Sequence, residues 1–146
     1  MPYNYPAEIL IVEDNSDDAE LILRAFNKYD LSDRLYLAEN GEDALDFIFC
    51  RGEFADRNPD TPIKAVFLDL KLPGLHGMEV LRRIKDNPKT RGLPVVILTS
   101  SGEASDIKMA YSLGANSYIV KPVDFSNFME AISGAGYYWI FLNEYP

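Results

Sequence analysis

The chain has 146 residues, the usual size of a single domain and enough to bury a hydrophobic core. Its formal net charge of -9 argues against a nucleic-acid surface, which needs clustered Lys and Arg. No apolar run reaches the roughly 20 residues that span a membrane. The start lacks both regions of a secretory signal, and the single cysteine, Cys50, excludes an internal disulfide. We therefore expect a cytoplasmic protein.

Strand-like and helix-like segments alternate along the chain. Short, wholly apolar runs such as 9–12 and 95–98 are typical of strands buried on both faces. The five predicted strands are 9–12, 35–38, 66–68, 95–98 and 118–120. The five predicted helices are roughly 17–29, 41–51, 77–86, 104–113 and 124–142. Asp17 or Asp18 is expected to cap the first helix, and Asp124 the last.

This alternation predicts an α/β fold, with a doubly wound, five-stranded parallel sheet and five helices on its two faces. We expect one domain over residues 1–146, with a core from about 7 to 142 and no effector domain. The stretch 52–62 combines glycine, prolines and charges, which predicts a surface loop before the central strand.

Polar side chains follow the predicted strands directly. Glu13 and Asp14 follow the first strand, Asp69 the third, Thr99 the fourth and Lys121 the fifth. In a doubly wound sheet, ligands bind at the carboxyl ends of the strands, beside the point where the strand order reverses. We therefore expect these side chains to meet at one rim of the sheet.

Three clustered carboxylates repel one another and favour a hard divalent cation, for which Mg²⁺ is the expected ion. A carboxylate is also a nucleophile toward phosphorus and forms an aspartyl-phosphate. Such transfer requires charge neutralisation and positioning, which Lys121 and the metal would supply, with a hydrogen bond from Thr99. Each residue also has a plainer role, such as the helix cap or turn that Asp69 could form. Their convergence at one rim favours the functional interpretation.

The chain resembles the receiver domain of two-component response regulators, a family with a flavodoxin-like fold. The resemblance covers nearly the whole chain and rests on four segments: Ile-Val-Glu-Asp-Asn at 11–15, Phe-Leu-Asp-Leu-Lys-Leu-Pro-Gly at 67–74, Val-Ile-Leu-Thr-Ser at 96–100 and Tyr-Ile-Val-Lys-Pro at 118–122. It implies that the protein accepts a phosphoryl group from a histidine kinase and signals by protein–protein contact. The only catalysis implied is self-phosphorylation and self-dephosphorylation.

The resemblance also assigns the acceptor and the metal ligands. Asp69 would be the phospho-acceptor, and Mg²⁺ the cofactor. Asp14 and Asp69 would bind the ion directly, Glu13 through water, and Lys71 through its backbone carbonyl.

Two further roles follow from the same resemblance. Thr99 and Tyr118 would form a switch pair that responds to phosphorylation, and Lys121 would bind the phosphoryl group. The peptide bond between Lys121 and Pro122 would be cis, an isomer that is common only before proline.

Within the family, the chain is similar to stand-alone regulators that serve phytochrome-type histidine kinases. The similarity rests on Leu-Asp-Phe at 45–47, the longer loop before the third strand, Lys-Pro-Val-Asp at 121–124 and the aromatic pair at 138–139. It implies a sensor kinase of that type as the partner, although the kinase and its stimulus are not encoded in this chain.

Two other functions are compatible with part of the pattern. An aspartate-nucleophile phosphatase also uses Mg²⁺, but such enzymes carry a second Asp two positions after the nucleophile, where this chain has Lys71. A receiver-like interaction module that is never phosphorylated would not need the full set of acidic residues and Lys121.

The last predicted helix has two apolar stripes, although a surface helix needs only one. The first stripe has the spacing to pack on the sheet and comprises Phe128, Ile132, Ala135 and Trp139. The second stripe comprises Ala131, Tyr138, Phe141, Leu142 and Tyr145. Because exposed apolar area usually marks a contact site, we expect a homodimer through this region. The alternative is that the second stripe folds back onto the fourth helix.

Overall fold

The computed structural model describes residues 7–146 and contains the predicted alternation of strands and helices. The strands are β1 (Ile9–Val12), β2 (Leu35–Ala38), β3 (Ala65–Leu68), β4 (Val95–Thr99) and β5 (Ser117–Val120). The helices are α1 (Ser16–Asn27), α2 (Gly41–Ile48), α3 (Gly77–Asp86), α4 (Ala104–Ser112) and α5 (Phe125–Tyr137). No helix in this part of the chain is long and apolar enough to cross a membrane.

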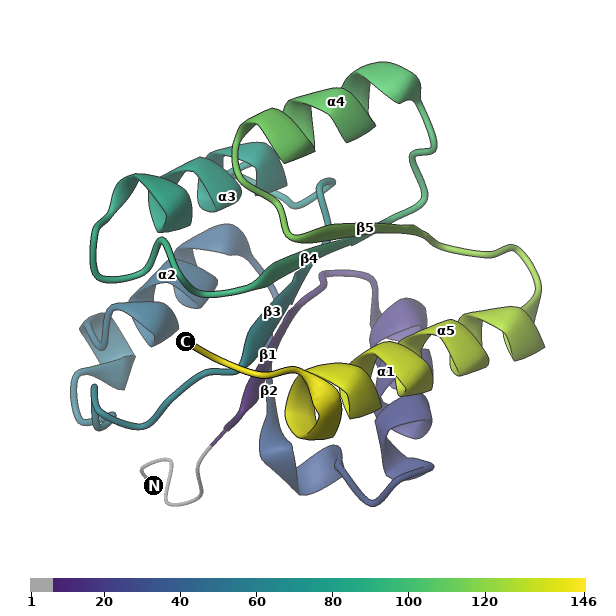
Figure 1. Cartoon of the computed structure of the whole chain (residues 1–146), viewed down its shortest axis with the longest axis horizontal. Coiled ribbons are helices and arrows are strands. Elements are labelled where there is room, and N and C mark those ends of the chain that lie inside the picture. Colours follow the sequence, from purple (N-terminus) through teal and green to yellow (C-terminus); the bar gives the residue numbers. More distant parts are fainter. Residues whose placement is uncertain (1–6) are drawn as a thin grey trace.

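The five strands form one parallel sheet in the order β2-β1-β3-β4-β5 (Figure 1). The chain starts near the middle, adds β2 on one side and then builds β3, β4 and β5 on the other. The order therefore reverses between β1 and β3, and the carboxyl ends of these two strands are the expected position of a site. The predicted doubly wound fold is confirmed.

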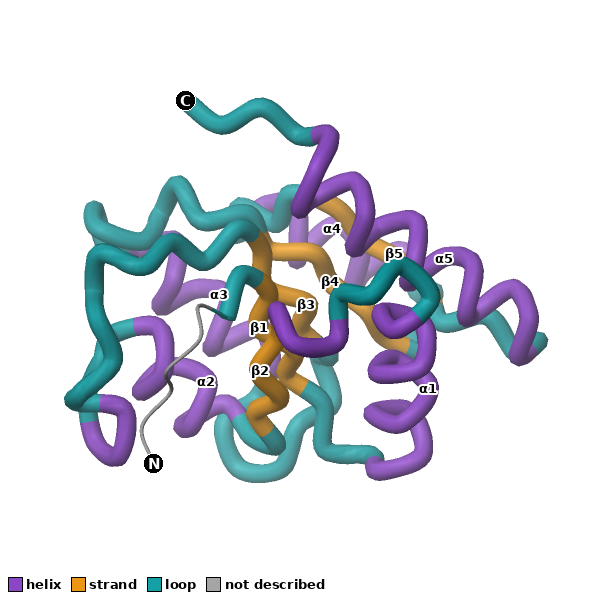
Figure 2. The backbone as a smooth tube through the Cα atoms, turned by 90° about the horizontal axis from the view of Figure 1, so that it is seen from below, coloured by secondary structure: helices purple, strands orange, loops and turns teal. Residues whose placement is uncertain are grey.

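Helices cover both faces of the sheet, with α1 and α5 on one face and α2 and α3 on the other (Figure 2). Alternate side chains of a strand point to opposite faces of the sheet. Because helices cover both faces, the central strands are buried on both sides. In β1, Leu10 and Val12 pack with α2 and α3, while Ile9 and Ile11 pack with α1 and α5. All four are at most 1% exposed, which explains the wholly apolar sequence of this strand.

The loop before β3 is less exposed than the sequence predicted. It contains a 3₁₀ turn, Gly52–Phe54, whose Phe54 is buried against the rings of Tyr36 and Phe47. Arg57 is also buried, and its guanidinium lies 4.5 Å from the ring centroid of Phe47. The prediction of a surface loop was therefore wrong for part of 52–62, because its aromatic side chain completes the core beside α2.

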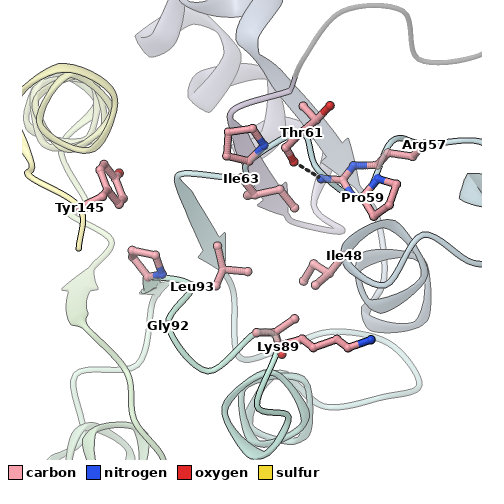
Figure 3. A pocket seen from close by; sticks show the side chains of 12 residues that line it. Ile48, Arg57, Pro59, Thr61, Ile63, Lys89, Gly92, Leu93 and Tyr145 are labelled. Carbon is pink, nitrogen blue, oxygen red and sulfur yellow. Dashed lines mark hydrogen bonds between the residues drawn. The ribbon is translucent and has the colours of Figure 1, made fainter.

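A hollow of about 270 Å³ lies between this loop and the segment before β4 (Figure 3). Its walls include Arg57, Ile63, Leu93 and Tyr145, and none of its lining residues is acidic. These walls lie where β3 and β4 begin, whereas Asp69 and Thr99 lie where the two strands end. The hollow is therefore separate from the predicted site.

The last helix continues into a π-helical turn, Tyr138–Leu142. Lys64 donates a hydrogen bond to the carbonyl of Ile140 at 3.0 Å, and the hydroxyl of Tyr145 lies 3.0 Å from the carbonyl of Lys64. These bonds fix the end of the chain to the beginning of β3.

Candidate functional site

The register of the sheet places the predicted residues at one rim. Val12 of β1 lies opposite Leu68 of β3, so Glu13 and Asp69, the next residues, leave neighbouring strands at the same level. The ladder extends to these residues, because the backbone N–H of Asp69 donates to the carbonyl of Val12 at 3.1 Å. From β5, the N–H of Lys121 donates to the carbonyl of Thr99 at 2.7 Å.

Three carboxylates converge at this rim. Glu13, Asp14 and Asp69 each offer an oxygen, and the three oxygens lie within 4.8 Å of one another. Glu13 and Asp69 are buried, whereas Asp14 is exposed. This set fits a hard divalent cation, which prefers oxygen ligands and retains water on its open side.

Lys121 reaches into the same cluster, and its side chain is 9% exposed. Its ammonium lies 2.7 Å from Glu13, 2.8 Å from Asp18 and 3.1 Å from Asp69. The predicted acceptor and the predicted phosphate-binding lysine are thus in direct contact.

Burial and charge shift the ionisation of this cluster in defined directions. Burial raises the pKa of Glu13 to about 7, against the opposing effect of its hydrogen bond with Lys121. Burial alone would lower the pKa of Lys121, but its hydrogen bonds to Asp18 and Glu13 outweigh burial and raise it. One ammonium therefore serves several carboxylates, and additional positive charge would relieve the remaining repulsion.

The predicted switch residues, Thr99 and Tyr118, both form hydrogen bonds with the loop after β4. The hydroxyl of Tyr118 donates to the backbone carbonyl of Ser101 at 2.9 Å. The fully buried Thr99 accepts, at 3.5 Å, from the N–H of the same Ser101. Ser101 in turn donates to Asp106 in the first turn of α4 at 2.5 Å. The two side chains are thus connected to α4 through one loop residue.

The loop after β3 is shaped by a close approach of α3. The N–H of Lys71 donates to the Asp69 carboxylate at 3.2 Å, which orients that side chain. A Cβ on Gly77, the first residue of α3, would lie 2.3 Å from the carbonyl of Asp69. Only glycine allows the helix to begin so near the backbone of Asp69.

Asp18 is the site residue that the sequence reasoning missed, because it was interpreted as a helix cap. Asn15 is the actual cap of α1 and accepts from the N–H of Asp18 at 3.0 Å, which leaves the Asp18 carboxylate for Lys121. The sequence does carry a signal for this role, because an acidic residue in the first turn of the helix after β1 can face the rim where the strands end. Asp124 does cap α5, as predicted.

The predicted cis bond between Lys121 and Pro122 was wrong, because the described residues contain no cis peptide. Proline permits either isomer at a small difference in free energy, so sequence alone does not determine the choice.

The family model of the response regulator receiver domain matches residues 9–133, which includes every strand and every predicted site residue. Among curated proteins, the probable methanogenesis regulatory protein FilR2 of Methanothrix harundinacea is 37% identical over 141 residues, covering 97% of this chain and 88% of FilR2. The response regulator Rcp1 of Synechocystis is 32% identical over 137 residues, covering 94% of this chain and 91% of Rcp1.

Solved structures agree with this assignment. The Mn²⁺-bound form of Rcp1 has a TM-score of 0.85 at 30% identity and covers 94% of this chain and 97% of its own. The phosphorylated cyanobacterial phytochrome response regulator RcpA has a TM-score of 0.88 at 30% identity and covers 97% of this chain and 99% of its own. The chain belongs to the response regulator receiver domain family and is a phospho-accepting response regulator.

Proposed function

We propose that Asp69 is the phospho-acceptor, and that it takes a phosphoryl group from a sensor histidine kinase with Mg²⁺ as the cofactor. The observation that carries this proposal is the position of Asp69. Its carboxylate lies at the reversal of strand order, 3.1 Å from the Lys121 ammonium and within the three-carboxylate cluster.

In this reaction an oxygen of Asp69 attacks phosphorus, and the P–N bond of the donor phosphohistidine breaks. The bonding electron pair returns to the imidazole nitrogen, so atoms and charge balance. Lys121 then donates to one phosphoryl oxygen, and the Thr99 hydroxyl to another. Little acid–base chemistry is needed, because catalysis of phosphoryl transfer is mainly positioning and charge stabilisation.

Mg²⁺ would be held by Asp14, Asp69 and the carbonyl of Lys71, with Glu13 acting through water. The hard oxygen donors of the cluster support this choice. When bound, the ion supplies the positive charge that the phosphoryl oxygens require.

The response would pass through Thr99 and Tyr118. When Thr99 turns to the phosphoryl group, its contact with the N–H of Ser101 is lost, and the loop that also holds the Tyr118 hydroxyl is freed to move. This is a two-state element biased by local charge. Thr99→Ala would accept phosphate but lose the response of α4.

The partner would be a cytoplasmic kinase of the phytochrome type, a choice that the similarity to the phytochrome response regulator RcpA supports. A hollow of about 310 Å³ lies beside Lys121, the residue whose ammonium contacts Asp69, and its partly apolar walls support contact with a partner protein there. It is lined by Asp18, Leu21, Ser100, Lys121, Pro122, Val123, Phe125 and Phe128.

Output would be protein contact, including a homodimer through the C-terminal region. The acidic surface supports neither nucleic-acid nor membrane binding.

Incubation with acetyl phosphate and Mg²⁺ tests the acceptor. We expect intact mass to show one added phosphoryl group on the wild-type chain and on Asp60→Asn, a control in the exposed loop before β3. Asp69→Asn should gain none, because its amide is not a nucleophile at this site. Equal labelling of Asp69→Asn would refute the assignment, and no labelling of the wild-type chain would favour the unphosphorylated interaction module.

A further inference from the structure

The ammonium of Lys121 uses all of its hydrogen-bonding capacity on carboxylates. An ammonium has three N–H donors. Lys121 directs them to one oxygen each of Glu13, Asp18 and Asp69, at 2.7, 2.8 and 3.1 Å. A phosphoryl oxygen can reach Lys121 only if one of these three bonds is released.

Two of the three carboxylates that accept hydrogen bonds from Lys121 change partners in the proposed reaction. Glu13 and Asp69 belong to the cluster whose oxygens lie within 4.8 Å of one another, so a cation held there would compete with Lys121 for them. Asp69 also becomes an acyl phosphate and loses its carboxylate charge. Asp18 is outside that cluster, and nothing in the reaction removes its charge.

Asp18 is held where it can keep this contact. Its backbone N–H is bound by the Asn15 cap at 3.0 Å, which fixes the first turn of α1. Its side chain is 32% exposed, whereas that of Glu13 is 1% exposed, so Asp18 contacts Lys121 from the solvent side of the cluster. Asp18 therefore holds the long Lys121 side chain from the first turn of α1, on the solvent side of the cluster.

We propose that Asp18 is a positioning residue, which keeps the Lys121 ammonium beside the acceptor while Glu13 and Asp69 exchange it for the cation and the phosphoryl group. This inference rests on the proposed function, because it assumes that Asp69 accepts phosphate. Asp18 does not touch the reacting atoms and acts through Lys121.

The test compares Asp18→Asn with Asp17→Asn. Asp17 is the neighbouring acid in the same helical turn and is exposed, so its substitution removes the same formal charge without the contact to Lys121. Asp18→Glu restores the charge on a longer arm and serves as the rescue variant. All three are made in the full chain.

The first measurement uses metal-free protein and does not depend on phosphorylation. The Lys121 ammonium is followed in ¹⁵N-edited spectra and assigned by its loss in Lys121→Arg. We expect its protons to exchange with water on the order of tenfold faster in Asp18→Asn, because the ammonium loses its ion pair with the Asp18 carboxylate and a neutral amide oxygen is the weaker acceptor. Asp17→Asn should match the wild-type chain, and Asp18→Glu should recover most of the protection.

The second measurement is the rate of phosphorylation by acetyl phosphate at saturating Mg²⁺. We expect a maximal rate about tenfold lower in Asp18→Asn, with recovery in Asp18→Glu and no comparable loss in Asp17→Asn. Unchanged ammonium exchange in Asp18→Asn would overturn the inference whether or not the wild-type chain accepts phosphate. Faster exchange with a normal or higher maximal rate would also overturn it, since Asp18 would then be dispensable or competing with the phosphoryl group.

Discussion

At the scale of single residues, the site contains more negative than positive charge. Lys121 alone faces the carboxylates of Glu13, Asp18 and Asp69, while Asp14 stands beside them without an ion pair among the described residues. Such a cluster is typical of a divalent metal site, and a group placed for binding is often unfavourable for the empty fold.

The substitution Asp14→Ala separates the effect of this carboxylate on metal binding from its effect on the stability of the metal-free fold. We expect Mg²⁺ affinity to fall by at least about tenfold, since Asp14 is proposed as a direct ligand and the loss of an outer-shell group alone already costs about 10–100-fold. The free energy of unfolding of the metal-free protein should stay equal or rise, because one repelling charge is removed. Calorimetric titration suits the first measurement, because the only tryptophan, Trp139, is in the turn after α5 and packs with the apolar cluster under α1.

Asp33→Ala provides the control, because Asp33 is exposed in the turn before β2, at the far end of the sheet. Its Mg²⁺ affinity should equal that of the wild-type chain. Unchanged affinity in Asp14→Ala would remove Asp14 from the ligand set.

At the scale of secondary-structure elements, close contacts determine which helix positions tolerate change. The pair α1 and α5 packs tightly enough that a Cβ on Gly136 would lie 2.5 Å from the ring of Phe26. Gly134, two residues earlier in the same helix, has no atom within 4 Å of such a Cβ. The two glycines look equivalent in the sequence but have different roles in the fold.

Gly136→Ala should destabilise the protein by about 1–3 kcal/mol, the usual cost of forcing extra volume into a packed interface. Gly134→Ala should stabilise it by about 1 kcal/mol, because alanine is the better helix former and meets no neighbour. Urea denaturation of both variants measures the difference. Equal effects in the two variants would show that α5 does not pack on α1 as described.

We expect the stability of the C-terminal turn to depend on pH through Tyr145. Its hydroxyl lies 2.5 Å from the carbonyl of Trp139 and 3.0 Å from that of Lys64. Burial raises the pKa of this phenol, and the charges of Glu8 and Tyr138 add to the rise, against a hydrogen bond with Asn143. The stabilisation is therefore complete below the ordinary phenol pKa of about 10 and is lost as the pH rises through the higher folded value.

Trp139 fluorescence should report this loss as an alkaline transition that Tyr145→Phe lacks, since phenylalanine has no proton to donate. All other titratable groups are present in both proteins, so the difference between the two isolates Tyr145. Tyr111→Phe, on exposed α4, is the matched control and should keep the transition. A transition in Tyr145→Phe identical to that of the wild-type chain would contradict this assignment.

At the scale of the whole molecule, the apolar side chains that remain exposed near the C-terminus raise the question of assembly. The first predicted stripe is confirmed as buried or half-buried, with Ile140 added to it. Four of the five residues of the second stripe stay exposed rather than buried on α4, with Tyr138, Phe141 and Leu142 at 44%, 48% and 58%, while Ala131 is half-buried. Exposed area of this kind supports the proposed dimer.

We expect light scattering to give the mass of a dimer at micromolar concentrations, and Leu142→Glu to give a monomer. Met109→Glu, equally exposed on α4, should remain dimeric. Substitution is a better test than truncation after Ala135, because truncation would also remove the buried Ile140. A monomeric wild-type chain, or a dimer that survives Leu142→Glu, would contradict a dimer through this stripe.

The sequence by itself determined the fold and most of the rim. Strands buried on both faces must be apolar throughout, so β1, β3 and β4 could be read directly, and parallel strands bring their carboxyl ends to one edge. The sequence alone therefore predicts that one rim holds Glu13, Asp14, Asp69 and Lys121.

Only the tertiary structure decided the contacts between groups whose local sequence allows several roles. Asp18 could cap α1 as well as Asn15 could, and its bond to Lys121, 103 positions away, depends on how α1 lies against β5. Gly136 is required only because Phe26 packs against it. Such choices depend on packing between distant segments, whereas apolar periodicity is a local property that the chain carries before it folds.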